Sequence, residues 1–266
     1  MATSSRSVLA VVGGGNMGAA LVGGLLSAGV VDSSGVVIVE VVPERRRQLA
    51  ADFPGVTITE SIPPCTEALI AVKPPDVAAA CSAAVAAGAR RVLSIAAGIT
   101  IARLESACGS GVAVVRAMPN TPALVGEGAS AIAGGTSASD DDVAWAERIL
   151  GSVGLVVRVA ENRLDAVTGL IGSGPAYLFL VAESLIAAGR AEGLADDVVD
   201  AMVRQLFTGA ARLLAEGDDP ADLRVRVTSP GGTTAAGLSV LDARGVRDAF
   251  AAAVAAATAR SRELGS

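Results

Sequence analysis

A short glycine-rich segment carries the first chemical signal in the chain. Residues 13–18 read GGGNMG, which fits the pattern G-x-G-x-x-G, and they directly follow the apolar run Val8–Val12. In this setting Gly13 permits a tight turn, Gly15 lets the backbone approach a pyrophosphate, and Gly18 lets a helix lie against a strand. The phosphates bind the N–H groups at the start of that helix. The segment predicts a dinucleotide site, and the alternative is a glycine-rich turn without a ligand.

An acidic residue stands near the place where the second strand of a dinucleotide-binding domain ends. A carboxylate at Glu40 would accept hydrogen bonds from the adenosine ribose and repel a 2′-phosphate. Arg45, Arg46 and Arg47 follow closely, and they would instead hold that phosphate. The pattern is consistent with either NADPH or NADH. A third interpretation makes Glu40 a solvated strand end and the arginines the exposed face of a helix.

The side chains that the chain lacks restrict the kinds of reaction that it could catalyse. It has no histidine, its only lysine is Lys73, and its only tyrosine, Tyr177, is followed by Val181 where a Tyr-x-x-x-Lys pair needs lysine. The bases that usually take a proton from an alcohol are therefore missing. An imine escapes this need, because its nitrogen carries its own proton as an iminium and only a hydride must be delivered. The inventory favours a reductase of a C=N bond.

Composition argues against several other classes of protein. Cys65, Cys81 and Cys108 are too far apart for a metal-binding pair, and histidine is absent, so we expect no metal site. Nothing suggests a disulfide framework, which favours a reducing, cytoplasmic compartment. A net charge of −6 and an aromatic content of 2% argue against a nucleic-acid partner.

Three further segments are placed to meet a ligand. AVKP (residues 71–74) ends a predicted parallel strand, where ligands bind in such sheets, and its Lys73 is either a charge near the cofactor or an exposed strand end. RAMPNTP (residues 116–122) ends another strand in a proline-stiffened turn that carries an amide side chain. SPGGTT (residues 229–234) is a glycine turn that opens a helix, so it offers N–H donors to a carboxylate. The alternative for SPGGTT is an ordinary capped helix start.

Hydrophobic patterning predicts the elements that position these segments. Up to residue 160, short and continuously apolar runs alternate with amphipathic stretches, which indicates a doubly wound α/β domain of the Rossmann type with a mostly parallel sheet. The expected strands are Val8–Val12, Val36–Val41, Val56–Thr59, Ala68–Val72, Val92–Ile95, Val112–Arg116, Ala129–Ala133 and Leu155–Val159. The expected helices are Met17–Ala28, Glu44–Asp52, Asp76–Ala87, Ile101–Ala107 and Asp140–Leu150.

A second, all-helical domain is expected over residues 161–266. The strand pattern stops after Glu161, and Asp197–Leu214 places Val199, Met202, Leu206, Ala210 and Leu213 on one stripe. The last helix, Val246–Leu264, is rich in alanine. Because a helical domain of this size has little core of its own, we expect a homo-oligomer that forms through it.

The chain is unusually apolar, with 52% hydrophobic residues and a mean hydropathy of +0.55. Residues 8–31 carry no charge over a length that would span a bilayer. Glycines and Asn16 interrupt this segment, which divides into a β-rich run, a glycine turn and a helical stretch. We therefore expect a protein without a membrane span.

Six motifs together indicate a family. GGGNMG, AVKP, SIAAG (residues 94–98), RAMPNTPALV (116–125), GSGPAY (172–177) and SPGGTT occur in an order that resembles pyrroline-5-carboxylate reductases over nearly the whole chain. The resemblance implies reduction of 1-pyrroline-5-carboxylate to L-proline by NADPH or NADH, the last step of proline biosynthesis. It also implies a homodimer built from intertwined C-terminal helices, often assembled into a decamer.

The resemblance also implies roles for individual residues. Thr234 would be catalytic, with its hydroxyl on the ring nitrogen, and Gly231, Gly232 and Thr233 would join it in clamping the substrate carboxylate. Ser173 and Pro175 would shape the pocket, unless they only pack a helix start. The resemblance implies cofactor residues at the pyrophosphate and beside the nicotinamide: Gly15, Asn16, Met17, Gly18, Ala71, Val72, Lys73, Pro74, Ala97, Gly98 and Asn120. Gly13 and Glu40 join them from the glycine motif and its spacing.

Two positions depart from the family pattern. Ile171 stands where serine usually precedes GSGPAY, and Gly217 stands where some relatives carry an acid, here flanked by Glu216 and Asp218. A hydroxyl contact at the first position and a carboxylate role at the second are not transferred. Two other functions remain open from the sequence: a reductase of another cyclic imino acid, and a non-catalytic NAD(P)-binding regulatory module.

Overall fold

The computed structural model describes residues 8–265, which form two compact units. Within this range the first unit comprises residues 8–173 and 255–265, and the second comprises Gly174–Val254. These units divide after residue 173, so the segment that follows the expected domain boundary at residue 160 begins in the first unit. The reason is that the segment after residue 160 packs on the sheet: Leu164 is buried there, and Glu161 pairs with Arg116 of a central strand.

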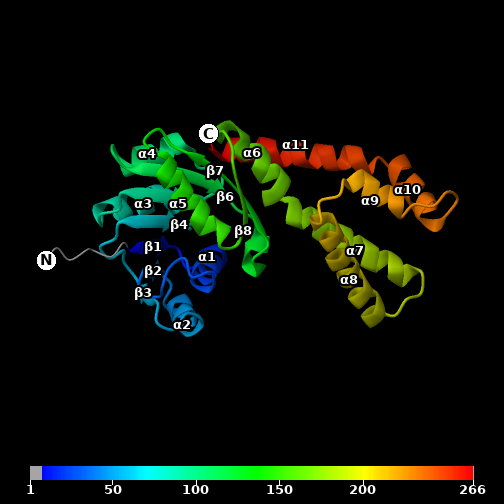
Figure 1. Cartoon of the computed structure of the whole chain (residues 1–266), viewed down its shortest axis with the longest axis horizontal. Coiled ribbons are helices and arrows are strands. Elements are labelled where there is room, and N and C mark those ends of the chain that lie inside the picture. Colours follow the sequence, from blue (N-terminus) through cyan, green and yellow to red (C-terminus); the bar gives the residue numbers. More distant parts are fainter. Residues whose placement is uncertain (1–7, 266) are drawn as a thin grey trace. The chain divides into compact units, whose positions relative to one another are not determined.

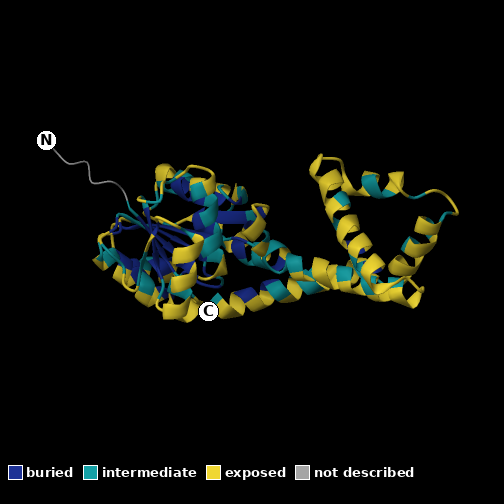
Figure 2. Cartoon of the chain, turned by 90° about the horizontal axis from the view of Figure 1, so that it is seen from below, coloured by how far each residue is buried: buried dark blue, intermediate teal, exposed yellow. Residues whose placement is uncertain are grey.

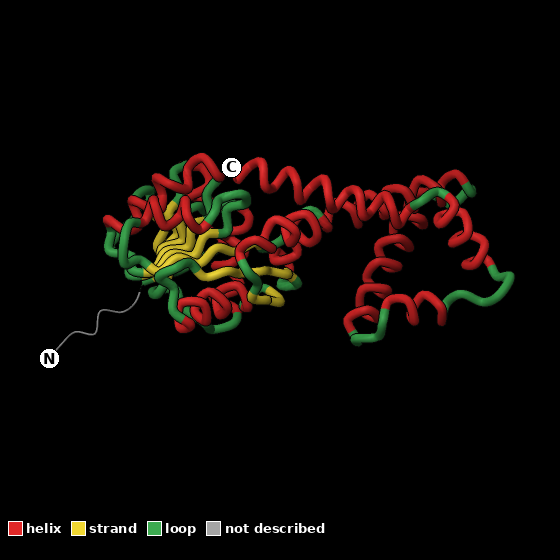
Figure 3. The backbone as a smooth tube through the Cα atoms, turned by 90° about the horizontal axis from the view of Figure 1, so that it is seen from above, coloured by secondary structure: helices red, strands yellow, loops and turns green. Residues whose placement is uncertain are grey.

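The first unit is built on an 8-stranded sheet, whose strands are arrows in Figure 1 and the yellow parts of the tube in Figure 3. The strand order is β3-β2-β1-β4-β5-β6-β7-β8, so the direction of winding reverses between β1 and β4. All eight expected strands are confirmed, with small shifts at their ends. They are β1 Leu9–Val12, β2 Val36–Val39, β3 Thr57–Thr59, β4 Glu67–Ile70, β5 Arg91–Ser94, β6 Ala113–Met118, β7 Gly128–Gly134 and β8 Gly154–Arg158.

The sheet is mostly parallel, as predicted, with one antiparallel junction. Strands β1 to β6 pair in parallel, whereas β7 pairs antiparallel with β6 and β8 pairs in parallel with β7. The link between β6 and β7 holds only the 3-10 helix η2 (Thr121–Val125). Because a parallel crossover needs a dozen or more residues, this short link turns the chain back on itself.

Helices cover both faces of the sheet. On one face lie α1 (Asn16–Ser27), α2 (Pro43–Asp52) and α5 (Asp140–Gly151), whose buried residues share a core cluster with Leu9 and Val11 of β1. On the other lie α3 (Val77–Ala86) and α4 (Ile101–Cys108), which pack with Ala10 and Val12 of the same strand. A strand buried on both faces has no polar alternation, which explains its continuously apolar sequence.

Short helical turns complete the first unit. They are η1 (Pro74–Asp76), η3 (Glu161–Arg163), α6 (Leu164–Val167) and the π-helical turn η4 (Thr168–Gly172). The three cysteines are free and buried, and burial raises the pKa of the Cys65 thiol above its ordinary value. No group of metal-binding side chains occurs within residues 8–265.

The second unit is helical, as predicted, and exposes much of its apolar surface. Its elements are α7 (Gly174–Ala191), α8 (Asp196–Ala215), α9 (Pro220–Arg226), α10 (Thr233–Ala243) and the first part of α11 (Val246–Gly265). Helices α7 and α8 approach closely, because a Cβ on Gly189 would lie 2.4 Å from Cγ2 of Val199. Of the predicted stripe on α8 only Val199 is buried, while Met202 is 62% and Leu206 56% exposed. Figure 2 shows this contrast, with dark blue concentrated in the sheet and yellow over the helices.

The uncharged segment at residues 8–31 contains β1 and the 12-residue helix α1 rather than a membrane span. A different stretch, Glu161–Ala191, is long and apolar enough to cross a membrane by length and composition alone, with a mean hydropathy of 1.5 over its most apolar window. It is not one regular α-helix, because it runs through η3, α6 and the π-helical turn η4 before α7 begins. None of that window is buried within the structure.

Candidate active site

The glycine loop lies where the winding of the sheet reverses. It leaves the carboxyl end of β1, next to the carboxyl end of β4, which is the place where open α/β sheets bind ligands. Gly13 has φ +107°, and a Cβ there would lie 2.5 Å from the carbonyl oxygen of Ala71. A Cβ on Gly18 would lie 2.1 Å from the carbonyl oxygen of Gly13. Both positions therefore require glycine, one for the turn and one for the contact between helix and loop.

The start of α1 is built to receive an anion. Gly15 is its N-cap, and among the described residues no side chain caps the helix. The first helical bond runs from Ala19 N to Gly15 O at 2.9 Å, so the N–H groups before Ala19 in the first turn have no partner within the helix. A Cβ on Gly15 would meet nothing within 4 Å, which shows open space above the loop. These features fit the pyrophosphate of a dinucleotide.

Glu40 closes the other side of the loop. It follows β2, and its Oε2 accepts a hydrogen bond from Gly14 N at 3.1 Å while its Oε1 accepts one from Val42 N at 2.8 Å. Arg45 Nε in turn donates to Gly14 O at 2.8 Å. The prediction of the site did not include Gly14. Only its position inside the motif could have pointed to it, because its partner is 26 residues away.

A cavity of about 380 Å³ opens beside the loop in the first unit. It is lined by seven of the predicted cofactor residues, namely Met17, Ala71, Val72, Lys73, Pro74, Ala97 and Asn120. Lys73 is the only ionisable residue in the lining, and it forms no ion pair with any residue in the described range. The Asn120 amide oxygen accepts a hydrogen bond from Ala129 N at 2.8 Å, which joins the β6 turn to β7.

Several lining residues were not predicted from the sequence. They are Ile95, Ala96, Met118, Pro119, Thr121 and Gly172. Gly172 is there because a π-helical turn brings it against Met118, and a Cβ on it would lie 2.5 Å from Met118 Cε. All six belong to SIAAG, RAMPNTPALV or GSGPAY, so the motifs contained the signal, although apart from Thr121 these residues carry no polar side chain.

Gly98 takes a different place from the other predicted residues. It is not part of the cavity lining, has φ +77°, and a Cβ on it would lie 3.1 Å from Leu264 Cβ at the end of α11. Its role in the structure is to let the end of that helix approach the loop after β5.

A buried arginine joins the elements around the cavity. Arg116 on β6 is 5% exposed, and its Nη1 lies 3.0 Å from Glu161 Oε1 while its Nη2 lies 3.7 Å from Asp165 Oδ1. Glu161 also accepts a hydrogen bond from Ile101 N at 2.6 Å, and Asp165 accepts one from Ser261 Oγ at 2.7 Å. One side chain thus connects β6 with the start of α4, with α6 and with α11.

The predicted substrate residues lie mainly in the second unit. Gly231 has φ +70° and Gly232 is the N-cap of α10, which begins at Thr233 and has no side-chain cap among the described residues. Ala236 N donates to Gly232 O at 3.1 Å, so the earlier N–H groups of this helix have no partner within it. Thr234 is exposed. This local geometry suits a carboxylate ligand.

Ser173 and Pro175 stand on either side of the division between the units. Ser173 N donates to Thr168 O at 2.9 Å at the end of the π-helical turn, and Pro175 is the second residue of α7. Both are partly buried. Ile171, one of the two departures from the family pattern, lies inside the same π-helical turn, and the other, Gly217, follows α8 with φ +96°.

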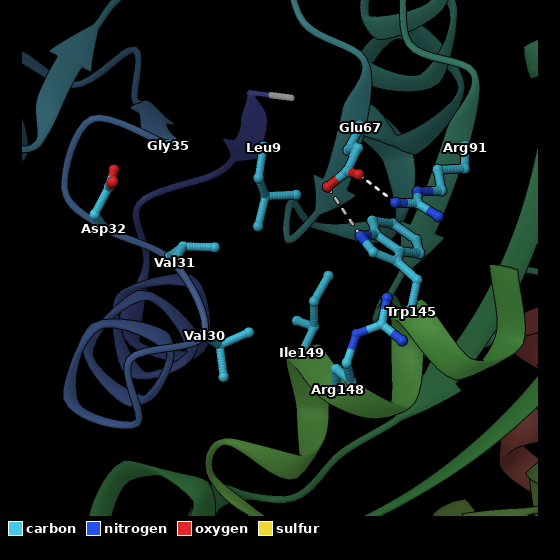
Figure 4. A pocket seen from close by; sticks show the side chains of 10 residues that line it. All are labelled: Leu9, Val30, Val31, Asp32, Gly35, Glu67, Arg91, Trp145, Arg148 and Ile149. Carbon is cyan, nitrogen blue, oxygen red and sulfur yellow. Dashed lines mark hydrogen bonds and ion pairs between the residues drawn. The ribbon is translucent and has the colours of Figure 1, made fainter. Parts of the chain in front are cut away.

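A second cavity, of about 360 Å³, lies at the opposite ends of the strands (Figure 4). Leu9, Glu67 and Arg91 are the first residues of their strands, so this cavity is at the amino ends. Trp145 Nε1 donates to Glu67 Oε2 at 2.9 Å, and Arg91 pairs with Glu67 while lying 4.7 Å from the centre of the indole ring. This network fastens α5 to the sheet. Because ligands in such sheets bind at the carboxyl ends, the first cavity is the candidate active site.

Comparison with known proteins agrees with this geometry. Residues 161–264 match a family model described as pyrroline-5-carboxylate reductase dimerisation, and residues 8–98 match one described as NADP oxidoreductase coenzyme F420-dependent. The chain is 38% identical over 288 residues to the pyrroline-5-carboxylate reductase of Mycobacterium leprae, covering 98% of each protein.

Two solved structures are similar along nearly the whole chain. A pyrroline-5-carboxylate reductase from Coxiella burnetii matches with a TM-score of 0.90 and 32% identity, covering 98% of this chain and 100% of that one. The pyrroline carboxylate reductase of Plasmodium falciparum, solved with NADP bound, matches with a TM-score of 0.86 and 28% identity over 99% and 100%. The resemblance predicted from the six motifs is thus confirmed, and the chain belongs to the pyrroline-5-carboxylate reductase family.

Proposed function

We propose that this protein reduces the C=N bond of 1-pyrroline-5-carboxylate to give L-proline, using NADPH or NADH. The observation that carries the proposal is the uncapped glycine loop at the reversal of the sheet, beside a cavity lined by AVKP and RAMPNTP, in a chain of this family. A reductase of another cyclic imino acid is the nearest alternative.

The cofactor is assigned to the first unit. The loop residues Gly13, Gly15, Asn16, Met17 and Gly18 hold the pyrophosphate on the free N–H groups of α1, and Glu40 meets the adenosine ribose. The nicotinamide is assigned to the cavity beside Ala71, Val72, Lys73, Pro74, Ala97 and Asn120, with Gly98 supporting the loop behind it. When bound, the reduced nicotinamide supplies the hydride.

The substrate is assigned to the start of α10. Its carboxylate binds in the turn formed by Gly231, Gly232, Thr233 and Thr234, which no described side chain caps. The N–H of Gly232 already donates to Ser229 O at 3.0 Å, so the donors of this turn are the N–H groups around it. The hydroxyl of Thr234 forms a hydrogen bond with the ring nitrogen and so orients the C=N bond. The family resemblance assigns Ser173 and Pro175 to substrate binding as well.

The residues of the first unit suit a hydride transfer without an acid or base. Lys73 is the only ionisable side chain in the cavity lining, and apart from it and the polar Asn120 and Thr121 the walls are apolar or glycine. An iminium already carries the proton that an alcohol dehydrogenase must move, so such walls are sufficient.

Replacement of Thr234 tests the proposed mechanism. In Thr234→Ala the turnover with pyrroline-5-carboxylate should fall roughly 100-fold, as expected when one hydrogen bond to the reacting group is lost. The affinity for the dinucleotide should change little, and Thr234→Ser should recover most of the turnover. Rates follow from the absorbance of the reduced nicotinamide, and affinities from calorimetric titration.

Ser239→Ala removes another exposed hydroxyl further along α10, so it is the matched control and should keep normal turnover. Unchanged turnover in Thr234→Ala would remove this residue from the mechanism. Comparison of five-membered and six-membered cyclic imino acids separates the two reductase assignments. Binding of dinucleotide without turnover of either substrate would instead indicate a regulatory module.

The assembly is proposed to be a homodimer formed by the C-terminal helices, with a decamer as the larger form. Support comes from the dimerisation match over residues 161–264 and from the exposed apolar residues of α7 and α8. A partner subunit on this surface also accounts for the apolar stretch Glu161–Ala191 without a membrane. A cytoplasmic location and the absence of a nucleic-acid or membrane partner belong to the same proposal.

A further inference from the structure

The adenosine end of the proposed cofactor site has an asymmetric set of charges. Glu40 is held between the glycine loop and the chain after β2 by two backbone N–H groups, those of Gly14 at 3.1 Å and Val42 at 2.8 Å. In domains of this type an acid at the end of the second strand accepts hydrogen bonds from the ribose 2′-hydroxyl, which marks NAD, while a nearby arginine accommodates the 2′-phosphate of NADP. The choice depends on which of the two groups is available here.

The arginines near Glu40 are already engaged. Arg46 Nη1 donates to the carbonyl oxygens of Glu40 at 2.8 Å and of Val41 at 2.9 Å, and its Nη2 lies 3.3 Å from Glu60. The Arg46 side chain is only 23% exposed. To reach a phosphate it would have to break two hydrogen bonds and an ion pair.

The two other arginines are engaged as well. Arg45 donates through Nε to Gly14 O at 2.8 Å and through Nη1 to Gln48 Oε1 at 3.2 Å. Arg47 pairs with Glu44 on the exposed face of α2. Arg45 and Arg46 therefore brace the loop and the strand end, and neither stands ready for a phosphate.

The residues directly after Glu40 are apolar and exposed. Val41 is 70% exposed and Val42 is 51% exposed, whereas Val36, Val37 and Val39 of the preceding strand are buried. Neither side chain can donate a hydrogen bond to a phosphate, and the Val42 N–H already serves Glu40. A 2′-phosphate placed here would meet a carboxylate and an apolar rim.

We propose that this protein selects NADH over NADPH and that Glu40 is the residue that decides the choice. The proposal rests on the proposed dinucleotide-dependent reductase activity and specifies the cofactor within it. The ribose hydroxyls donate to the carboxylate, whereas a 2′-phosphate is repelled by it and would have to draw Arg45 or Arg46 away from its backbone partner. Arg45 and Arg46 act as positioning residues, because they hold the backbone that presents Glu40.

Calorimetric titration of the purified full-length protein tests this selection directly. NADH should bind at least about tenfold more tightly than NADPH, a difference of about 1.4 kcal/mol. The same order should appear in kcat/KM with pyrroline-5-carboxylate. Tighter or equal binding of NADPH would overturn the selection alone, whereas binding of neither dinucleotide would overturn both the selection and the proposed function.

Single substitutions test whether Glu40 determines the preference for NADH over NADPH. Glu40→Gln keeps the shape and removes the charge, so the affinity ratio of NADPH to NADH should rise about tenfold. Val41→Arg should raise the same ratio further, because it places an uncommitted guanidinium beside the ribose. Glu44→Gln removes an exposed acid on α2 that pairs with Arg47, so it is the matched control and should leave the ratio unchanged.

Alanine variants of Arg45 and Arg46 test whether either arginine binds the 2′-phosphate. In Arg45→Ala and Arg46→Ala the two dinucleotides should lose affinity together, since each arginine supports the backbone that both cofactors use. A loss of more than about tenfold for NADPH alone would show that the arginine turns to hold the 2′-phosphate, and it would overturn the proposal.

Discussion

At the scale of single residues, the candidate active site depends on glycines, because these residues have no side chain to fill the loop. Gly13 and Gly18 leave no room for a Cβ, and Gly15 leaves space above the loop where phosphates are proposed to bind. The steric need for glycine at residues 13 and 18 follows from the motif because it is local to the loop, while the role of Gly15 toward a pyrophosphate stays a prediction. The motif did not predict that Glu40 holds Gly14, since that contact depends on where β2 ends relative to β1.

Two glycines of α1 should respond differently to the same substitution. Gly18→Ala should weaken dinucleotide binding at least about tenfold, because its Cβ would lie 2.1 Å from the backbone oxygen of Gly13. Gly23→Ala should bind normally and gain about 0.5–1 kcal/mol of stability, since its Cβ would meet only Phe53 at 3.6 Å. Calorimetric titration and urea unfolding measure the two effects. Equal binding by both variants would contradict the steric role of Gly18.

At the scale of elements, the order of strands and helices followed from hydrophobic patterning, whereas their junctions did not. The eight strands were predictable because burial on both faces leaves continuously apolar runs. The antiparallel pairing of β7 was not, because it depends on the length of the link through η2. The packing of α6 and the end of α11 on the sheet also escaped prediction, since it depends on Arg116 and its distant acids.

Removal of the buried guanidinium should destabilise the first unit. In Arg116→Met two carboxylates, Glu161 and Asp165, lose their shared countercharge, and we expect a loss of about 3–5 kcal/mol in the free energy of unfolding. Arg158→Met is the matched control, because that arginine is 48% exposed and pairs with Glu147 at 2.5 Å on the surface. Its urea midpoint should stay close to that of the parent. Similar losses of unfolding free energy in both variants would show that the buried Arg116 ion pairs stabilise the protein no more than a surface ion pair does.

At the scale of the whole molecule, the two units differ in how they bury apolar surface. The first unit encloses its sheet between helices, but in the second Val199 and Val203 are the buried apolar side chains of the described helices α7 to α10. Met202, Leu206 and Leu213 of α8 are instead more than half exposed. Large exposed apolar surfaces of this kind are typical of interfaces between subunits, in agreement with the dimerisation match over this part of the chain.

A charge on the exposed side of α8 should disrupt the assembly. Leu206→Glu places a carboxylate in the proposed interface, so the mass measured by light scattering at micromolar concentration should fall toward that of one chain. Leu155→Glu is the matched control, because Leu155 on β8 is similarly exposed at 66% but lies outside the helical unit. An unchanged mass for Leu206→Glu would exclude this face from the interface.

By itself, the sequence determined the features that depend on neighbouring residues: the strands and helices, the glycine loop, the α10 turn and the lack of an acid or base for alcohol chemistry. Tertiary structure decided which distant residues meet. It placed Glu40 on Gly14 across 26 residues and Arg116 on Glu161 across 45, brought Gly172 to the cavity through a π-helical turn, and bonded Arg46 to the carbonyl oxygen of Glu40. Local patterns follow from backbone geometry and burial, whereas these contacts exist only after the elements have packed.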